Sequence, residues 1–258
     1  MKLSLDAAQS LVVGALLRSG VDAHNAASVA RALVSAEAAG QGGHGLRRVP
    51  AYSAQAKAGK VDGQVMPRAV SPRPSVLAID AMNGFAYPAL DLAVAELPEI
   101  AKAQGIAIAS IYRSHHAGVM GLTVERFAEQ GLAAMMFANA PASIAPWGGK
   151  KALYGTNPIA FSVPIAGGDP ITVDLAISKV ARGKIMAARQ KGEAIPDDWA
   201  FDLDGNPTTD AEVAMTGMMA PLGGAKGAAL AMMVEILSAG ITGANYAFEA
   251  SSLFDDKG

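Results

Sequence analysis

Residues 75–113, SVLAIDAMNGFAYPALDLAVAELPEIAKAQGIAIASIYR, are the most informative stretch of the sequence for fold class. A short run of β-type apolar residues at 75–80 comes first. Apolar residues at helical spacing follow from about Pro88 to Gln104, with Pro98 as a predicted kink, and a second β-type run occupies 105–113. A strand, a helix and a strand in this order predict an α/β fold.

The alternation continues toward the C-terminus. A helix is predicted from about Leu122 to Gln130 and a strand at 132–140. Strands at 159–165 and 171–177 follow one another with no helix between them, which predicts antiparallel pairing. We therefore expect a mixed β-sheet flanked by helices. The other predictions in this half are a helix at 178–190, an irregular polar segment at 195–221 and a helix at 226–239.

Toward the N-terminus the pattern is helical. Residues 4–39 read as a helical hairpin, and the glycine-rich loop GQGGHGLRRVP follows at 40–50. A short helix at 51–58 leads to a connector at 61–74 that contains proline and glycine. We expect this connector to separate a helical N-terminal part, residues 1–72, from a mixed-sheet α/β domain, residues 73–258.

Composition excludes several classes of protein. The chain has 258 residues, 51% of them hydrophobic, so it can bury a sizeable core and is not disordered. The net charge of −2 gives no basic face for nucleic acid. A cysteine count of 0 excludes disulfides, thiolate metal sites and a thiol nucleophile.

Neither the apolar stretch near the N-terminus nor the one near the C-terminus has the features of a targeting or membrane segment. Asp6 interrupts the first apolar stretch, unlike the core of a secretion signal. Glu235 lies in the middle of the most apolar segment, 225–246, which argues against a membrane span. We expect a cytoplasmic protein with no membrane partner.

Three of the 4 histidines lie in glycine-bearing loops, where binding and catalysis concentrate. His44 is surrounded by glycines, and a solvated loop residue is the alternative interpretation. Arg48 could bind a carboxylate bidentately, but the neighbouring Arg47 leaves the choice open on spacing alone. His115 and His116 are adjacent at a strand end, so we expect at most one of them to face a given site.

Two turns favour anions. SHHAGVMG at 114–121 lies between a predicted strand and helix, and GGAKGAAL at 223–230 opens a helix, so backbone N–H groups at both places suit phosphate. Neither turn is the G-x-G-x-x-G fingerprint of a Rossmann unit, and no P-loop occurs. Residues 202–213 do not match an EF-hand and no zinc-binding motif occurs, so we predict no metal. The elbow motif of a serine hydrolase does not occur either. From the residues alone, a ligand site is expected but no reaction is identified.

Several longer motifs in fixed order resemble the malate/L-lactate dehydrogenase-like family of NAD(P)-dependent oxidoreductases, and the resemblance covers essentially the whole chain. The motifs are GHGLRRVPAY, SHHAGVMG, GTNPIAFSVP, DLAISKVARGKI, GNPTTD and PLGGAKGAALAMMVEIL. The resemblance implies a non-Rossmann α/β fold, a homodimer, and NADP or NAD, with NADPH preferred, beside a small 2-oxo or 2-imino acid. It further implies that the family continues beyond DDKG with additional cofactor contacts.

The resemblance assigns roles by position. His44 is similar to the acid/base histidine and Arg48 to the residue that binds the substrate carboxylate, while His116 is similar to a second catalytic histidine. Thr156 resembles a substrate contact. Lys184 stands where some members have an aspartate of a Ser-His-acid relay. The cofactor contacts implied are His116, Ala117, Gly118, Val119, Met120, Asp174, Leu175, Ala176, Lys226 and Gly227.

Two departures from the family pattern bear on the substrate. Gly43 stands where most members have serine, and His115 stands where hydroxyacid dehydrogenases commonly have asparagine. SHH, NGFAYPAL and TGANYAFEASS are more similar to the Δ1-pyrroline-2-carboxylate and Δ1-piperideine-2-carboxylate reductases. The resemblance therefore favours reduction of a cyclic 2-imino acid. The alternatives are a malate- or L-lactate-type 2-hydroxyacid dehydrogenase and a non-catalytic ligand-binding protein.

Overall fold

The computed structural model describes residues 2–257, which form two compact units. Unit 1 draws on Met1–Met135, Phe161–Thr172 and Ser251–Gly258, and unit 2 on Met136–Ala160 and Val173–Ala250. The boundary expected between residues 72 and 73 lies inside unit 1, and the corresponding division into a helical and a mixed-sheet domain stays a prediction.

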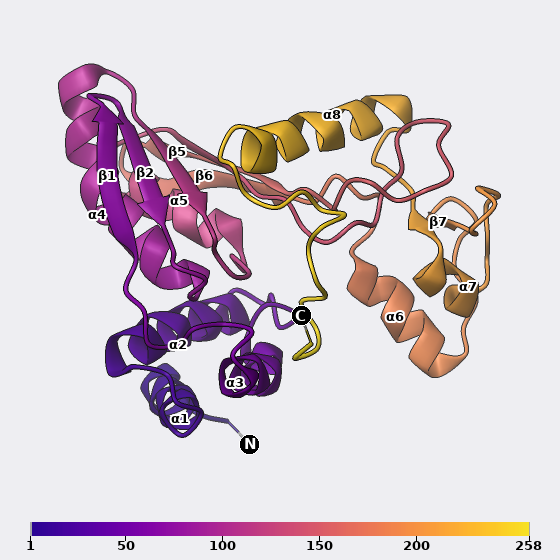
Figure 1. The fold of residues 1–258 in the computed structure, drawn as a ribbon, viewed down its shortest axis with the longest axis horizontal. Coiled ribbons are helices and arrows are strands. Elements are labelled where there is room, and N and C mark those ends of the chain that lie inside the picture. Colours follow the sequence, from indigo (N-terminus) through magenta and orange to yellow (C-terminus); the bar gives the residue numbers. More distant parts are fainter. Residues whose placement is uncertain (1, 258) are drawn as a thin grey trace. The chain divides into compact units, whose positions relative to one another are not determined.

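Three helices open unit 1. In α1 (Leu5–Leu17) and α2 (Ala23–Ala38) the first turn is capped by Ser4 and Asp22, whose side chains accept backbone N–H groups. The two helices pack against each other, and α1 also contacts α3 (Figure 1). A short 3-10 helix, η1 (Leu46–Arg48), leads into α3 (Val49–Ala58), which has proline in its first turn and ends at Gly59 with φ 79°.

The sheet of unit 1 contains both strand orientations. β1 (Arg68–Arg73) pairs antiparallel with β2 (Val76–Asp80), and β2 pairs parallel with β3 (Ile108–Tyr112). The crossover between the parallel strands is α4 (Ala86–Gln104), which includes Pro98 and packs on β2 and β3 (Figure 1). The mixed sheet with helices confirms the α/β prediction.

β1 corrects the connector predicted at 61–74. All six residues of this strand are exposed, so it lacks the apolar alternation that marks a half-buried strand. It lies at the edge of the sheet, where Pro72 is tolerated because one side of an edge strand needs no ladder hydrogen bonds.

A second three-stranded sheet has the order β4-β5-β6. Its strands are β4 (Ala134–Phe137), β5 (Ile159–Ile165) and β6 (Gly168–Leu175), and α5 (Met120–Ala128) precedes them in the chain. β5 and β6 are sheet neighbours joined by only Ala166 and Gly167, a connection short enough for a hairpin.

Unit 2 has more regular structure than the sequence predicts. Two short strands, β7 (Ala200–Phe201) and β8 (Met218–Met219), pair antiparallel, and α7 (Ala211–Thr216) lies between them in the chain. The prediction of an irregular segment at 195–221 was therefore wrong, because elements of two to six residues are too short to show a period.

Both long helices of unit 2 also differ from their predicted bounds. α6 (Arg182–Lys191) begins later than predicted because the backbone just before it is paired elsewhere: Lys179 N donates to Ala220 O at 2.8 Å. α8 (Ala225–Glu235) continues as a π-helix, η2 (Ile236–Gly240). Within residues 2–257, no helix combines the length and apolarity needed to cross a membrane.

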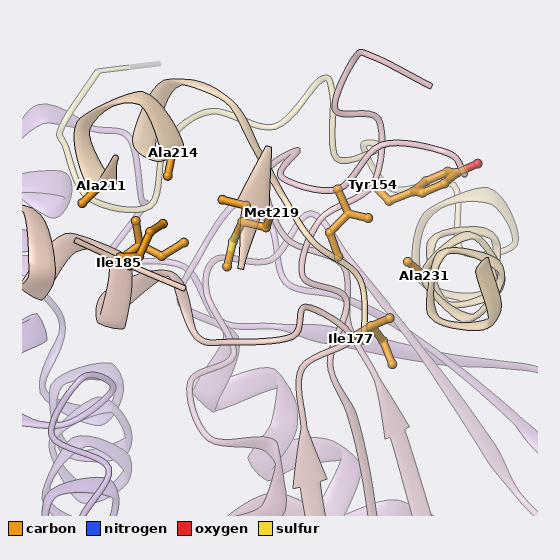
Figure 2. Packing of buried hydrophobic residues seen from close by; sticks show 10 residues of the cluster. Tyr154, Ile177, Ile185, Ala211, Ala214, Met219 and Ala231 are labelled. Carbon is orange, nitrogen blue, oxygen red and sulfur yellow. The ribbon is translucent and has the colours of Figure 1, made fainter. Parts of the chain in front are cut away.

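The core of unit 2 lies between its helices and its loops. Figure 2 shows side chains of α6, α7, β8 and α8 contributing to this cluster. Ile144, Ile177, Ile185 and Ala231 are each at most 1% exposed. The buried residues are Ile144, Tyr154, Ile177, Ile185, Ile195, Ala200, Ala211, Ala214, Met219 and Ala231.

A buried carboxylate ties α8 to two loops of unit 2. Glu235, 3% exposed, accepts hydrogen bonds from Asn157 Nδ2 at 2.8 Å, Asn139 Nδ2 at 3.1 Å and Ala247 N at 2.7 Å. Asn157 also donates to Ala231 O at 2.8 Å and has φ 39°, a left-handed conformation that asparagine tolerates. Three donors thus satisfy a carboxylate that has no cationic partner among the described residues.

Candidate active site

An aromatic and histidine cluster in unit 1 forms around Tyr52, which α3 supplies and which is 0% exposed. The loop before η1 contributes His44, and the loop between β3 and α5 contributes His115 and His116. The His44 and His116 rings stack with centroids 5.2 Å apart. Tyr52 meets His115 edge-on at 4.9 Å and donates or accepts a hydrogen bond with His116 Nδ1 at 2.6 Å.

His115 and His116 both face this cluster, so the expectation that only one of them does so was wrong. The expectation assumed the alternation of an extended strand. β3 ends at Tyr112, however, and Arg113 has φ 52°, so both histidines follow a turn rather than a strand.

Arg48 is the buried member of the arginine pair. Its residue is 8% exposed, whereas Arg47 is exposed. Arg48 Nε donates to Gly43 O at 2.9 Å, Nη1 donates to Leu253 O at 3.3 Å, and its guanidinium lies 4.7 Å from the centroid of the Phe254 ring. Across residues 2–257 no carboxylate pairs with it. A buried cation without a carboxylate partner favours binding of an anion.

Both imidazoles beside Tyr52 are neutral at pH 7. Burial lowers the pKa of His115 to about 4, with smaller contributions from the positive charges of Lys60 and Arg48. Burial likewise lowers the pKa of His116 well below its ordinary value, assisted by Arg48 and the other histidines. Burial raises the pKa of Tyr52 well above its ordinary value. The cluster therefore offers neutral hydrogen-bonding groups next to two fixed cations.

Lys60 is a cation that sequence reasoning missed. Its side chain is 7% exposed, and Nζ donates to Ser252 O at 2.6 Å and Lys257 O at 2.6 Å. Asp255, 47% exposed, is its carboxylate partner at 3.4 Å. A lysine in a polar turn after a helix carries no local signal of burial, because the segment that covers it is distant in sequence. Tyr52 and Tyr87 were also missed, although Tyr52 lies within GHGLRRVPAY.

The turn at 116–120 contains the unit 1 residues for which the resemblance implies cofactor contacts. Gly118 has φ 70°, and a Cβ there would collide with the Tyr87 hydroxyl, so only glycine fits. Val119 is the N-cap of α5, and its side chain makes no capping hydrogen bond. Met120, 1% exposed, packs in the core, so its contact with a cofactor would be through the backbone.

The remaining predicted residues belong to unit 2. Thr156 is partly buried, and its carbonyl accepts from Ile177 N at 2.7 Å. Asp174 and Leu175 end β6 and are exposed, while Ala176 is partly buried. The structure thus brings His44, Arg48 and His116 together in unit 1 and does not include these residues in that cluster.

Two lysines of unit 2 are exposed at helix starts. Lys184 lies in the first turn of α6, and Lys226 in the first turn of α8. The N-cap of α8, Gly224, offers no side-chain hydrogen bond, so this terminus is open to an anion as predicted for a phosphate. Packing alone explains the glycine at position 227, because a Cβ there would collide with Leu222 O. In the described part of the chain, no group of His, Asp and Glu side chains is arranged to hold a metal ion.

Comparison with known proteins gives a consistent result. A (2R)-3-sulfolactate dehydrogenase (NADP(+)) of Chromohalobacter salexigens is 50% identical over 256 residues, which cover 99% of this chain and 77% of that protein. A Delta(1)-pyrroline-2-carboxylate/Delta(1)-piperideine-2-carboxylate reductase of Pseudomonas putida is 40% identical, covering 93% and 71%.

Solved structures agree. The crystal structure of a delta1-piperideine-2-carboxylate reductase from Pseudomonas syringae superposes with a TM-score of 0.94 at 38% identity, covering 97% of this chain and 76% of that one. Residues 3–258 match the family described as malate/L-lactate dehydrogenase. The resemblance inferred from the motifs is confirmed, and the chain belongs to the malate/L-lactate dehydrogenase family of oxidoreductases.

Proposed function

We propose that the chain is an NAD(P)-dependent oxidoreductase that acts at C2 of a small 2-oxo or 2-hydroxy acid. The observation that carries this proposal is the buried guanidinium of Arg48, which has no carboxylate partner among the described residues. A substrate carboxylate would neutralise it with the bidentate geometry that guanidinium favours. His44 and His116 lie in the same cluster, with their rings stacked 5.2 Å apart between centroids.

The charge of the cluster favours an oxo acid over an imine. Arg48 and Lys60 both act to keep His115 uncharged, and the part of this positive potential that Asp255 and the substrate carboxylate do not neutralise would oppose the iminium form of a cyclic imino acid. An uncharged oxo group is not repelled by these positive charges. A second anionic group on the substrate would be attracted by them, and binding would be stronger. The relative named as a sulfolactate dehydrogenase is consistent with such a dianionic substrate.

Reduction of a cyclic 2-imino acid is the second candidate. The motif SHH at 114–116 and the reductases at 40% and 38% identity favour it. An iminium needs less help from an acid than a ketone does, because it already carries positive charge, so the missing hydroxyl at Gly43 would be tolerable.

The cofactor proposed is NADP, or NAD as the alternative, bound without a Rossmann unit. When bound it supplies or accepts a hydride at C4 of its nicotinamide. The N-terminus of α8, where the N-cap Gly224 offers no side-chain hydrogen bond, fits a phosphate of the cofactor, with Lys226 as a further contact. Arg48 fixes the substrate carboxylate, and His44 and His116 hold protons near the reacting oxygen.

We also propose that the protein is a homodimer, as the family resemblance implies. Four residues on one face of α8 and its extension are apolar and exposed: Ala229, Met232, Met233 and Ile236. Their spacing of three and four residues makes a continuous stripe on the helix surface. A solvent-facing helix normally carries charged residues there, so the stripe fits an interface.

The test measures NADPH and NADH oxidation by the full-length protein with 3-sulfopyruvate, oxaloacetate, pyruvate and Δ1-pyrroline-2-carboxylate. Turnover that prefers the dianionic oxo acids is expected. Selective turnover of the imine would replace the proposal by the second candidate, and cofactor binding without turnover of any acid would support a ligand-binding protein.

Variants of the arginine pair complete this test. Arg48→Lys keeps the charge but loses the bidentate geometry, and we expect KM to rise by about tenfold or more, the cost of one charge-assisted hydrogen bond. Arg47→Ala changes the exposed neighbour and serves as the matched control, with kinetics unchanged. Equal effects of the two substitutions would contradict the role of Arg48.

A further inference from the structure

Tyr52 makes a short hydrogen bond with a histidine of the proposed site. Its hydroxyl lies 2.6 Å from His116 Nδ1, with Tyr52 fully buried and His116 half-buried. The Tyr87 hydroxyl, from α4, lies 3.3 Å from the Tyr52 hydroxyl. A chain of three polar groups therefore runs Tyr87, Tyr52, His116 through the interior of unit 1.

Elementary chemistry fixes the direction of the bond between Tyr52 and His116. A neutral imidazole carries a proton on one ring nitrogen, and its bare nitrogen is a stronger base than a phenol oxygen. The favoured arrangement has Tyr52 donating its O–H to Nδ1, while Tyr87 donates to the Tyr52 oxygen. The ring proton of His116 then resides on Nε2.

The surroundings exclude a relay in which Tyr52 gives up its proton. Burial raises the pKa of Tyr52 well above its ordinary value, an effect that the Arg48 charge only partly offsets. His116 resists a second proton because of its own burial and the charges of Arg48, His44 and His115. Lys60 adds positive potential at His115. Both partners consequently stay neutral, and the bond orients the imidazole without transferring charge.

We propose that Tyr52 is a positioning residue that holds His116 as the Nε2–H tautomer, so that His116 acts as a neutral N–H donor toward the oxygen of the substrate. The inference rests on the proposed function for the identity of that oxygen. The geometry itself is independent of it.

The local sequence explains why such a device is useful in this chain. Gly43 provides no hydroxyl beside His44, so a serine cannot orient a histidine there. Tyr87 is held close to the turn that carries His116, because glycine at position 118 leaves room for its hydroxyl. The two tyrosines thus supply from α3 and α4 a fixed orientation for a catalytic histidine.

The first measurement is the nitrogen-15 NMR spectrum of the histidine rings, which separates protonated from bare nitrogens. With only 4 histidines, His116→Gln identifies the signals of His116 by their loss. The wild type is expected to show a proton on Nε2, and Tyr52→Phe a mixture of tautomers. A proton on Nδ1 in the wild type, or an unchanged tautomer in Tyr52→Phe, would overturn the inference.

Kinetics provide a second readout. Tyr52→Phe is expected to lower kcat for the 2-oxo acid by about tenfold at unchanged KM, the effect of one misdirected hydrogen bond. Tyr87→Phe should lower it less, because the bond to Nδ1 remains. Tyr246→Phe removes the hydroxyl of a tyrosine in unit 2 that is 37% exposed, and should leave both kcat and the tautomer unchanged.

The outcomes separate the inference from the proposed function. If no acid is turned over by the wild type, the proposed function fails, and the tautomer measurement still decides the role of Tyr52. If Tyr52→Phe raises KM and leaves kcat unaltered, the tyrosine shapes the binding pocket and the positioning role is wrong.

Discussion

His115 has two ring nitrogens that are buried without a hydrogen-bond partner among residues 2–257. The Tyr52 and Phe85 rings meet its imidazole edge-on, with centroids 4.9 and 5.6 Å away. Such an environment accepts the neutral ring at a moderate cost and penalises the charged ring strongly. The protonation state of this one residue therefore couples to the stability of unit 1.

The coupling predicts how stability depends on pH. The pKa of His115 falls from about 6.5 when unfolded to about 4 when folded, so the unfolded state binds more protons between these values. The contribution of neutral His115 to the stability of the folded state is complete above pH 6.5 and declines as the pH falls toward 4. Between pH 7 and 5 the wild type should lose about 2 kcal/mol more than His115→Asn, measured by urea unfolding. An equal pH dependence of the two proteins would show that His115 is charged or exposed.

Gly43 offers a second prediction for a single residue. A Cβ there would meet no atom within 4 Å, so Gly43→Ser restores the family hydroxyl without strain. We expect stability within about 0.5 kcal/mol of the wild type and higher kcat with 2-oxo acids, since a hydroxyl is returned beside His44.

Gly45→Ala is the contrasting variant for that experiment. Its Cβ would collide with the Glu37 side chain and lie 3.0 Å from the Glu37 backbone, so thermal unfolding should shift to lower temperature. A Gly43→Ser protein as unstable as Gly45→Ala would contradict the open space at position 43.

Single residues differ in how far the sequence reveals them. His44, Arg48 and His116 were predicted because they lie in motifs, and the structure clusters them, but spacing could not separate Arg48 from Arg47. Burial separates them, and burial depends on Leu253 and Phe254, about 200 positions along the chain. Lys60 was missed for the same reason, because the carbonyls it binds come from residues 252–257.

At the scale of elements, the buried Glu235 carboxylate joins α8 to the loop that carries Thr156. Glu235→Ala would remove the acceptor of three hydrogen bonds and leave the buried Ala247 N–H without a partner, so we expect a loss of about 2–4 kcal/mol of unfolding free energy. Glu235→Gln keeps one oxygen but sets an amide N–H₂ against donors, so a smaller loss is expected.

Urea unfolding at pH 7 checks this ordering. Glu193→Gln is the matched control, because that side chain is 62% exposed. Removing the charge of Glu193 should change the unfolding free energy by less than about 0.5 kcal/mol. A Glu235→Ala protein as stable as the control would mean that water replaces the carboxylate. This role could not be predicted from local sequence, since Glu235 lies among apolar residues and its partners lie on distant loops.

Elements with a clear period were predicted well, and the others were not. α4 and β3 follow from the stretch 75–113, because burial on one helix face and in a strand leaves a period in the sequence. β1, with six exposed residues, leaves none, and neither do the two-residue strands β7 and β8. These strands are stabilised by pairing with neighbouring strands, and the local sequence preference for strand does not predict such pairing.

At the scale of the whole molecule, the family was recognisable because its motifs are spread along the chain in fixed order, whereas composition alone excluded classes without naming one. Assembly is a property at this scale. Met232, Met233 and Ile236 on the α8 stripe are 45%, 40% and 48% exposed, a surface that a second copy would cover. In a dimer with twofold symmetry each substitution acts twice, so one buried charge on the stripe would be strongly disruptive.

Met233→Glu therefore should convert the full-length protein from dimer to monomer at micromolar concentration in sedimentation velocity. Ile106→Glu places the same charge at an apolar residue of unit 1 that is 75% exposed, and should leave the dimer intact. A wild type that sediments as a monomer would refute the dimer. A Met233→Glu protein that remains dimeric would move the interface away from α8, because a glutamate cannot be buried there without a cationic partner.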